Sequence, residues 1–77
     1  GTNGFSPSAG FSTPDINEAM VKSCALAHTQ QAYILCDSSK FYHTSPVTFG
    51  EFSDGIILTD KYPDESYRKY ENIVAVP

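Results

Sequence analysis

An apolar stretch of the sequence stops at a carboxylate, two hydroxyls and an ammonium group. The letters QAYILC at 31–36 are followed directly by Asp37, Ser38, Ser39 and Lys40. Asp37 could accept hydrogen bonds from sugar hydroxyls, the serines could donate to phosphate oxygens, and Lys40 supplies a positive charge for an anion. Asp37 and the two serines could instead cap a following turn or helix. Their spacing alone leaves both interpretations open.

Two further groups of residues have types and spacing suited to ligand binding. Glu18 and Lys22 stand four residues apart with the acid first, the order that favours an ion pair on a helix surface. Asn3 and Gly4 favour a tight turn with positive φ, which would expose backbone N–H groups to a ligand. A solvated helix face and an ordinary turn explain the same patterns, so neither group identifies a site by itself.

Composition argues against several classes of function. The formal net charge is −4, and the five basic residues are scattered, whereas a nucleic-acid-binding surface needs clustered Lys and Arg. Cys24 and Cys36 form neither a CxxC pair nor a zinc pattern, so we expect free thiols. We expect His28 and His43 at the surface, and no metal or cofactor. Because no run of about 18 apolar residues and no signal peptide is present, we expect a cytoplasmic protein without membrane contact.

The length limits the fold to one small unit. A chain of 77 residues with 40% apolar content buries a thin core and is marginally stable unless something else covers its apolar faces. The sequence opens on GTNGF without an initiator Met and ends on the apolar letters VAVP. We therefore expect a fragment of a longer protein, and a homo-oligomer.

The elements that must position these groups begin with a helix. Residues 1–13 are rich in Gly, Pro and Ser and are predicted to form a loop. Apolar residues then recur at spacings of four, four and three, which predicts a helix over about 14–29 with one apolar stripe. The stripe consists of Ile16, Met20, Cys24 and Ala27. Either Thr13, ahead of a proline at the first helical position, or Asp15, with an acid three residues later, can cap this helix.

Three unalternating apolar runs predict strands. They lie at 31–36, 55–59 and 73–76. Runs without polar alternation are typical of parallel strands covered on both faces. A segment at 47–49 favours an extended conformation, and 63–71, with a proline and acids at its start, predicts a second helix. The predicted architecture is α/β, a partial parallel sheet with flanking helices packed on it. Residues 37–40 then lie at the carboxyl end of a strand, where open parallel sheets bind ligands.

Together, these motifs resemble the effector-binding C-terminal domain of DeoR-family bacterial transcriptional repressors, over essentially the whole chain. The motifs are Gly1-Thr2-Asn3-Gly4-Phe5, Ser12-Thr13-Pro14, Glu18-Ala19-Met20-Val21-Lys22-Ser23 and Asp37-Ser38-Ser39-Lys40-Phe41-Tyr42. Two residues depart from the family pattern. Ser23 stands where the family usually has Arg, and Tyr42 stands where it usually has Gly.

The resemblance implies the fold of phosphosugar isomerases such as ribose-5-phosphate isomerase and glucosamine-6-phosphate deaminase, used here to sense a phosphorylated sugar. It implies that residues 1–77 are the C-terminal part of the sensing domain. DNA would be contacted only through a winged helix-turn-helix domain that is absent from this chain. The implied effector-binding residues are Asn3, Gly4, Glu18, Lys22, Asp37, Ser38, Ser39 and Lys40. Among these, Asn3 and Glu18 would hold hydroxyls, and the two lysines would balance the charge of the phosphate or of Asp37.

Two other functions stay open at this point. The chain could be a fragment of an actual phosphosugar isomerase, with Asp37 or Glu18 as general base. It could also be an oligomerisation surface without ligand contacts. For the sensor we expect Glu18, Lys22, Asp37 and Lys40 to share one cleft. We also expect a lysine neighbour to lower the pKa of Asp37.

Overall fold

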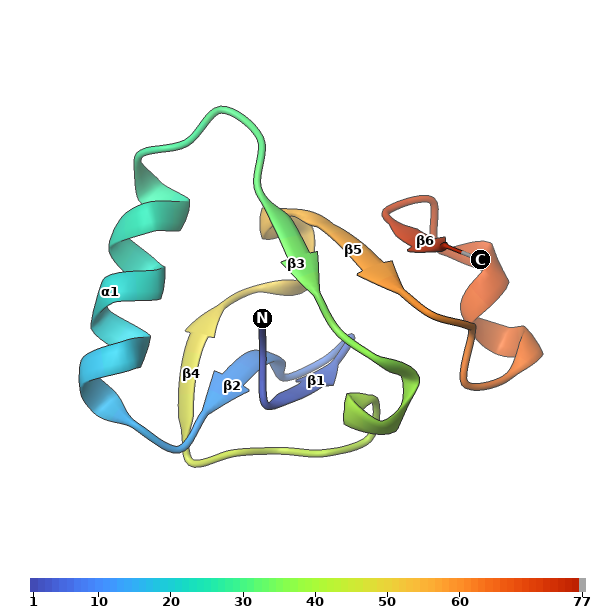
Figure 1. Cartoon of the computed structure of the whole chain (residues 1–77), viewed down its shortest axis with the longest axis horizontal. Helices are drawn as coiled ribbons and strands as arrows, with labels where there is room; N and C mark the ends of the chain where they lie inside the picture. The colour runs from blue at the N-terminus through green and yellow to red at the C-terminus, as the bar shows by residue number, and fades with distance from the viewer. Residues whose placement is uncertain (77) are drawn as a thin grey trace.

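Residues 1–76 are described by a computed structural model, which contains two small sheets and one α-helix (Figure 1). The antiparallel sheet has the order β1-β2-β4 and contains β1 (Gly4–Ser6), β2 (Gly10–Thr13) and β4 (Val47–Gly50). The parallel sheet has the order β3-β5-β6 and contains β3 (Tyr33–Leu35), β5 (Ile56–Thr59) and β6 (Ile73–Ala75). The helices are α1 (Ile16–Ala27) and three short 3₁₀ helices, η1 (Ser38–Lys40), η2 (Phe52–Asp54) and η3 (Glu65–Lys69). The chain is therefore a mixed α/β structure.

The parallel sheet confirms the three predicted strands as parallel neighbours. β3 pairs with β5, and β5 pairs with β6. In this register Ile34 lies opposite Ile57, which lies opposite Ile73, and all three side chains are buried. These isoleucines form one covered face of the sheet, because residues that share a register position point to the same side.

The other face of the parallel sheet is open in this chain. Tyr33 and Leu35 on β3 are 60% and 61% exposed, and Val74 on β6 is 40% exposed. Only one of the two apolar faces is therefore covered within residues 1–76, as expected if the chain is a fragment whose apolar faces need cover from elsewhere. Unalternating apolar runs indicate two apolar faces, but they do not place the partner of each face within the same chain.

The N-terminal segment, predicted as a loop, forms the hairpin of β1 and β2. Phe5 lies opposite Phe11, and both side chains are 0% exposed. Gly10 has a φ of +78°, and a Cβ there would lie 2.1 Å from the carbonyl oxygen of Gly50. The prediction was wrong because the glycine serves a tight reversal between packed strands, and burial of two phenylalanines outweighs the local loop signals.

Helix α1 begins and ends within two residues of its predicted bounds. Its N-cap is Asp15, whose carboxylate accepts a hydrogen bond from the N–H of Asn17 at 2.8 Å. Of the two predicted caps, the structure therefore uses Asp15. Ser23, at the position of the family's arginine, donates from its hydroxyl to the carbonyl oxygen of Phe49 on β4 at 2.8 Å. This contact ties the helix to the antiparallel sheet.

The packing of α1 corrects the predicted layer arrangement. The helix lies against β2 and β4 and not on the parallel sheet, with Ala19 buried and Leu26 packed against the core (Figure 1). The predicted apolar stripe is on the opposite side, with Ile16 58% and Met20 65% exposed. The periodicity predicted the helix correctly, but the side of α1 that packs against the core is not the predicted apolar stripe.

β4 and η3 lie where the sequence predicts an extended segment and a second helix. The extended segment at 47–49 is confirmed as β4, which pairs with β2. The predicted helix at 63–71 is present only as the 3₁₀ helix η3. Within it, Tyr67 is buried and packs edge-on against Phe41, with ring centroids 5.1 Å apart. The element ends at Lys69, four residues before β6 begins at Ile73.

An aromatic cluster joins the antiparallel sheet to the segments around η1 and η2. The ring of Phe5 lies 5.1 Å from Phe11, 5.2 Å from Phe41 and 5.5 Å from Phe52, measured between centroids. Phe41 follows η1 directly, and it also forms a β-bridge with Phe5. The core therefore fixes the end of the polar loop after β3.

None of the helices within residues 1–76 is long and apolar enough to cross a membrane.

Candidate functional site

The polar residues after β3 form a capped turn at the carboxyl end of the parallel sheet. The carboxylate of Asp37 accepts hydrogen bonds from the N–H of Ser39 at 2.9 Å and from the hydroxyl of Ser39. These two bonds, the hydroxyl first, hold the pKa of Asp37 below its usual value, and Lys40 lowers the pKa less. The predicted direction is confirmed, but the lysine is not its main cause. The capping interpretation of these residues is confirmed, and it leaves Lys40 free of that role.

Asp60 joins this group, although sequence reasoning did not include it. It directly follows β5, and its carboxylate accepts the N–H of Ser38 at 2.7 Å and the hydroxyl of Ser38 at 3.3 Å. The bond from the backbone N–H of Ser38 is the largest influence lowering the pKa of Asp60. The sequence carried the signal: an aspartate ends the run at 55–59 as Asp37 ends the run at 31–36, and parallel neighbours end at the same edge.

Glu18 and Lys22 do not pair with each other, so the predicted surface ion pair is wrong. The Nζ atom of Lys22 donates to the carbonyl oxygen of Gly1 at 2.6 Å and lies 5.1 Å from the ring centroid of Phe49. Glu18 instead accepts a hydrogen bond from the hydroxyl of Thr13 at 3.1 Å. Both side chains have partners from outside the helix, which local spacing does not reveal.

Asn3 and Gly4 lead into β1 and do not form a turn with positive φ at the glycine. The N–H of Asn3 donates to the carbonyl oxygen of Ser12 at 3.1 Å. Gly4 is buried, and a Cβ at this position would lie 2.5 Å from the carbonyl oxygen of His43. The predicted turn is therefore wrong. Gly4 allows close approach of the segment that follows η1, which is a structural requirement for glycine.

The N-terminal residues lie between the two groups of predicted site residues. The N–H of Thr2 donates to the carbonyl oxygen of Leu35 at 3.3 Å, while Gly1 accepts from α1 as described above. Figure 1 shows the N-terminus between α1 and β3. The hollow that Lys22 lines between α1 and β3, about 340 Å³, includes neither Asp37 nor Lys40. The structure thus brings residues 37–40 together, and a cleft shared with Glu18 and Lys22 stays a prediction.

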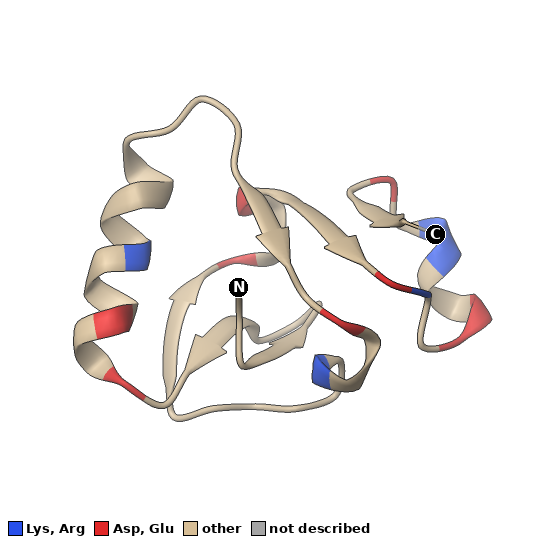
Figure 2. Cartoon of the chain, in the orientation of Figure 1, with Lys and Arg blue, Asp and Glu red and all other residues tan. Residues whose placement is uncertain are grey.

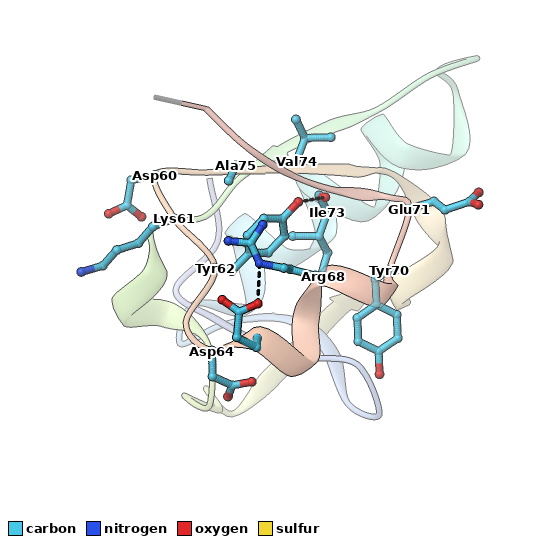
Figure 3. Close-up of a pocket in the computed structure, with 11 residues that line it drawn as sticks. Asp60, Lys61, Tyr62, Asp64, Arg68, Tyr70, Glu71, Ile73, Val74 and Ala75 are labelled. Atoms are coloured by element: carbon cyan, nitrogen blue, oxygen red, sulfur yellow. Dashed lines mark hydrogen bonds and ion pairs between the residues drawn. The ribbon is translucent and has the colours of Figure 1, made fainter.

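A larger hollow lies beside the edge strand β6 (Figure 3). It has a volume of about 990 Å³ and reaches Asp60, but it includes none of the eight predicted site residues. Arg68 stacks over the ring of Tyr62 at 4.9 Å and forms an ion pair with Glu65 at 2.7 Å. Because residues 37–40 and Asp60 gather at the carboxyl ends of β3 and β5, where parallel sheets bind ligands, we place the candidate site there.

Charge is dispersed over the described part of the chain. Figure 2 shows the basic positions spread over α1, η1, the segment after β5 and η3. They are Lys22, Lys40, Lys61, Arg68 and Lys69. Within residues 1–76 no three metal-ligating side chains come together. Both histidines are exposed, as predicted.

The two cysteines are free thiols in very different surroundings. Cys24 is exposed on α1, whereas Cys36 is 3% exposed at the end of β3. Burial, followed by the nearby charge of Asp37, raises the pKa of Cys36 to about 11. The thiolate is the reacting form of cysteine, so burial and this pKa both slow the reaction of Cys36.

We therefore expect one fast and one slow thiol in the native chain. At pH 8, Cys36 should react at least about 100-fold more slowly than Cys24, because a buried thiol with a pKa of about 11 is about 100-fold less ionised than an ordinary thiol. Reaction with a chromogenic disulfide, followed by mass spectrometry, measures both rates. The variant Cys24→Ser should retain only the slow phase, and guanidinium should make both thiols fast. Equal native rates would contradict the burial of Cys36.

The chain matches the profile of one family and is similar to one known protein described here. The profile of the family described as DeoR C terminal sensor domain matches residues 1–61. The chain is 37% identical over 76 residues to the "Uncharacterized HTH-type transcriptional regulator FruR" of Bacillus subtilis (strain 168). That alignment covers 99% of this chain and 30% of the relative, so the chain spans about 30% of the relative's length. No solved structure gives a significant match.

Proposed function

This chain belongs to the family of DeoR C-terminal sensor domains, and we propose that the effector it senses is a phosphorylated sugar. The observation that carries this proposal is the polar loop at the carboxyl ends of β3 and β5, where parallel sheets bind ligands. Lys40, half-buried in this loop, supplies a point charge for a phosphate. Asp37 and Asp60 supply carboxylate oxygens that can accept hydrogen bonds from sugar hydroxyls.

The proposed mechanism belongs to the longer regulator that would carry this chain. A phosphorylated sugar that binds one state of the sensor more tightly than another shifts the equilibrium between them, and DNA binding by an upstream winged helix-turn-helix domain changes with it. In this proposal residues 1–77 are the C-terminal part of a sensing domain with the fold of phosphosugar isomerases. The protein would act in the cytoplasm as a homo-oligomer.

The isomerase alternative gains no support from the candidate general bases. A base that works near neutral pH needs a pKa raised toward that value. The pKa of Asp37 is instead lowered by its hydrogen bonds with Ser39, and Glu18 already accepts a hydrogen bond from Thr13. These environments suit carboxylates that hold hydroxyls in place.

Removing the charge of Lys40 should weaken effector binding by the longer regulator. For Lys40→Met we expect a loss of about 10- to 100-fold in affinity, the value of one hydrogen bond to a charged group. Calorimetric titration with a panel of phosphorylated sugars and their unphosphorylated counterparts measures it. Lys69→Met, which removes an exposed charge on η3, serves as the matched control.

Two outcomes would contradict the proposed function. Equal affinity for phosphorylated and unphosphorylated sugars would show that phosphate is not recognised. Aldose–ketose conversion by the longer protein would instead establish the enzyme alternative. Reading the coding sequence upstream of Gly1 tests the regulator itself, because a basic winged-helix region there is what the proposal requires.

A further inference from the structure

The loop after η1 ends in a turn that holds an unusual residue. Phe41 has a φ of −63° and a ψ of 144°, Tyr42 has a φ of +71°, and the N–H of His43 donates to the carbonyl oxygen of Lys40 at 3.2 Å. These features match a type II β-turn, whose third position requires positive φ and usually takes Gly or Asn. Within residues 1–76, Tyr42 is the one non-glycine residue with positive φ. A bulky side chain there is a conformational cost that other contacts must offset.

The side chain of Tyr42 makes contacts that reach across to the next loop. Its hydroxyl donates to the carboxylate of Asp64, the N-cap of η3, and its ring lies edge-on to Tyr67 at 5.7 Å. Tyr42 remains 61% exposed, so burial of the ring does not explain why a tyrosine occupies this position. The hydrogen bond raises the pKa of Tyr42 and, after the bond from Ser66, also lowers the pKa of Asp64.

The beginning of the same loop is tied to the same segment. Ser38 donates from both its N–H and its hydroxyl to Asp60, as described above. The loop at 38–42 is thus joined to the segment at 60–64 at both ends, by Ser38 at one end and by Tyr42 at the other. Lys40 lies between these two attachments, so its position depends on both.

We propose that Tyr42 is a positioning residue that latches the loop at 38–42 to the segment at 60–64 and so fixes Lys40 for the effector. The latch is the pair of side chains Tyr42 and Asp64. The proposal that this latch affects effector binding rests on the proposed function, whereas the contact between Tyr42 and Asp64 does not depend on it. The positive φ persists because relaxing the turn would move the ring away from Asp64.

Amide hydrogen exchange of the chain tests the latch through a double-mutant cycle. Tyr42→Phe removes only the hydroxyl and should speed exchange of the Lys40, Tyr42 and His43 amides about three- to tenfold, the effect of one net hydrogen bond. Asp64→Ala also removes the cap of η3, so it should speed the same amides in both backgrounds, but clearly less in the Tyr42→Phe background than in the parent chain. Tyr33→Phe, the same chemical change at an exposed tyrosine on β3, should change none of these rates. If Asp64→Ala has equal effects in both backgrounds, the latch is refuted.

Effector titration of the longer regulator tests the positioning role. With a panel of phosphorylated sugars as probes, Tyr42→Phe should raise the Kd about three- to tenfold through the same hydrogen bond. Tyr42→Gly should also raise the Kd, although it relieves the backbone. If the turn were only structural, Tyr42→Gly should bind with an unchanged or lower Kd, and that result would overturn the positioning role. If no sugar phosphate binds the parent regulator, the proposed function fails, while the exchange cycle still decides whether the latch exists.

Discussion

Replacing Phe5 by alanine is expected to remove a large part of this chain's stability. Phe5 is fully buried and contacts the rings of three other phenylalanines, so truncation should cost about 3–5 kcal/mol. A chain of 77 residues has about 4–12 kcal/mol of stability in total. Urea denaturation followed by far-ultraviolet circular dichroism measures the loss as a lower midpoint, or as a missing transition.

A matched control separates this effect from the removal of any aromatic ring. Tyr33→Ala also deletes a ring, but that ring is 60% exposed on the open sheet face, and we expect a cost below about 1 kcal/mol. Phe5→Leu keeps most of the volume and should cost less than about 2 kcal/mol, which leaves a folded protein for binding studies. Equal costs for Phe5→Ala and Tyr33→Ala would show that the aromatic cluster is not the core.

The effect of Phe5 should reach the candidate site, because this residue holds the end of the polar loop. Its carbonyl oxygen accepts the N–H of Tyr42 at 3.1 Å, and its ring packs edge-on against Phe41. Lys40 directly precedes these two residues. The hairpin of β1 and β2 therefore supports the candidate site by contacting Phe41 and Tyr42, although none of residues 37–40 lies on either strand.

The parallel sheet could be predicted from the sequence because its signal is local to each strand. The runs at 31–36, 55–59 and 73–76 each contain a short strand in the structure, and all pair in parallel. The hairpin at 4–13 could not be predicted in this way. Gly10 reads as a loop residue, and only the tertiary burial of Phe5 and Phe11 shows that the segment belongs to a sheet.

The candidate site likewise contains residues that the sequence could identify and contacts that only the folded chain shows. Residues 37–40 were found because a strand end is visible in the sequence, and Asp60 could have been found by the same rule. The partners of Lys22 and Glu18 could not, because Gly1 and Thr13 reach them only through the folded chain. Local patterns identify candidate donors and acceptors, while tertiary contacts decide which of them are already occupied.

The isolated chain is expected to self-associate through its open apolar surfaces. Tyr33, Leu35, Val74 and Val76 are between 40% and 61% exposed at the uncovered side of the parallel sheet and just after β6. Contiguous apolar surface of this kind favours association, since water is released from both copies. Light scattering and sedimentation should show oligomers at micromolar concentrations. Leu35→Lys should weaken association at least about tenfold, because a charge would be buried at the contact.

Thr44→Lys is the matched control for this variant. It adds the same charge at an exposed polar position, so both variants share one net charge and differ only in where the lysine lies. If both variants associate as strongly as the parent chain, the open sheet face is not the contact.

The same chain should bind phosphorylated sugars only weakly, with a Kd in the millimolar range or above. A phosphate in water needs several convergent donors, and in this chain Lys22 is already bonded to Gly1. The N-terminus of α1 does not replace it, because Asp15 caps that end and Glu18 adds a second negative charge in the first turn. In the proposed function, Lys40 and the loop at 37–40 would therefore be part of a site that further residues of the longer regulator complete. Calorimetric titration beside light scattering tests this directly, and micromolar binding by a monomer would show that residues 1–77 form a complete sensor.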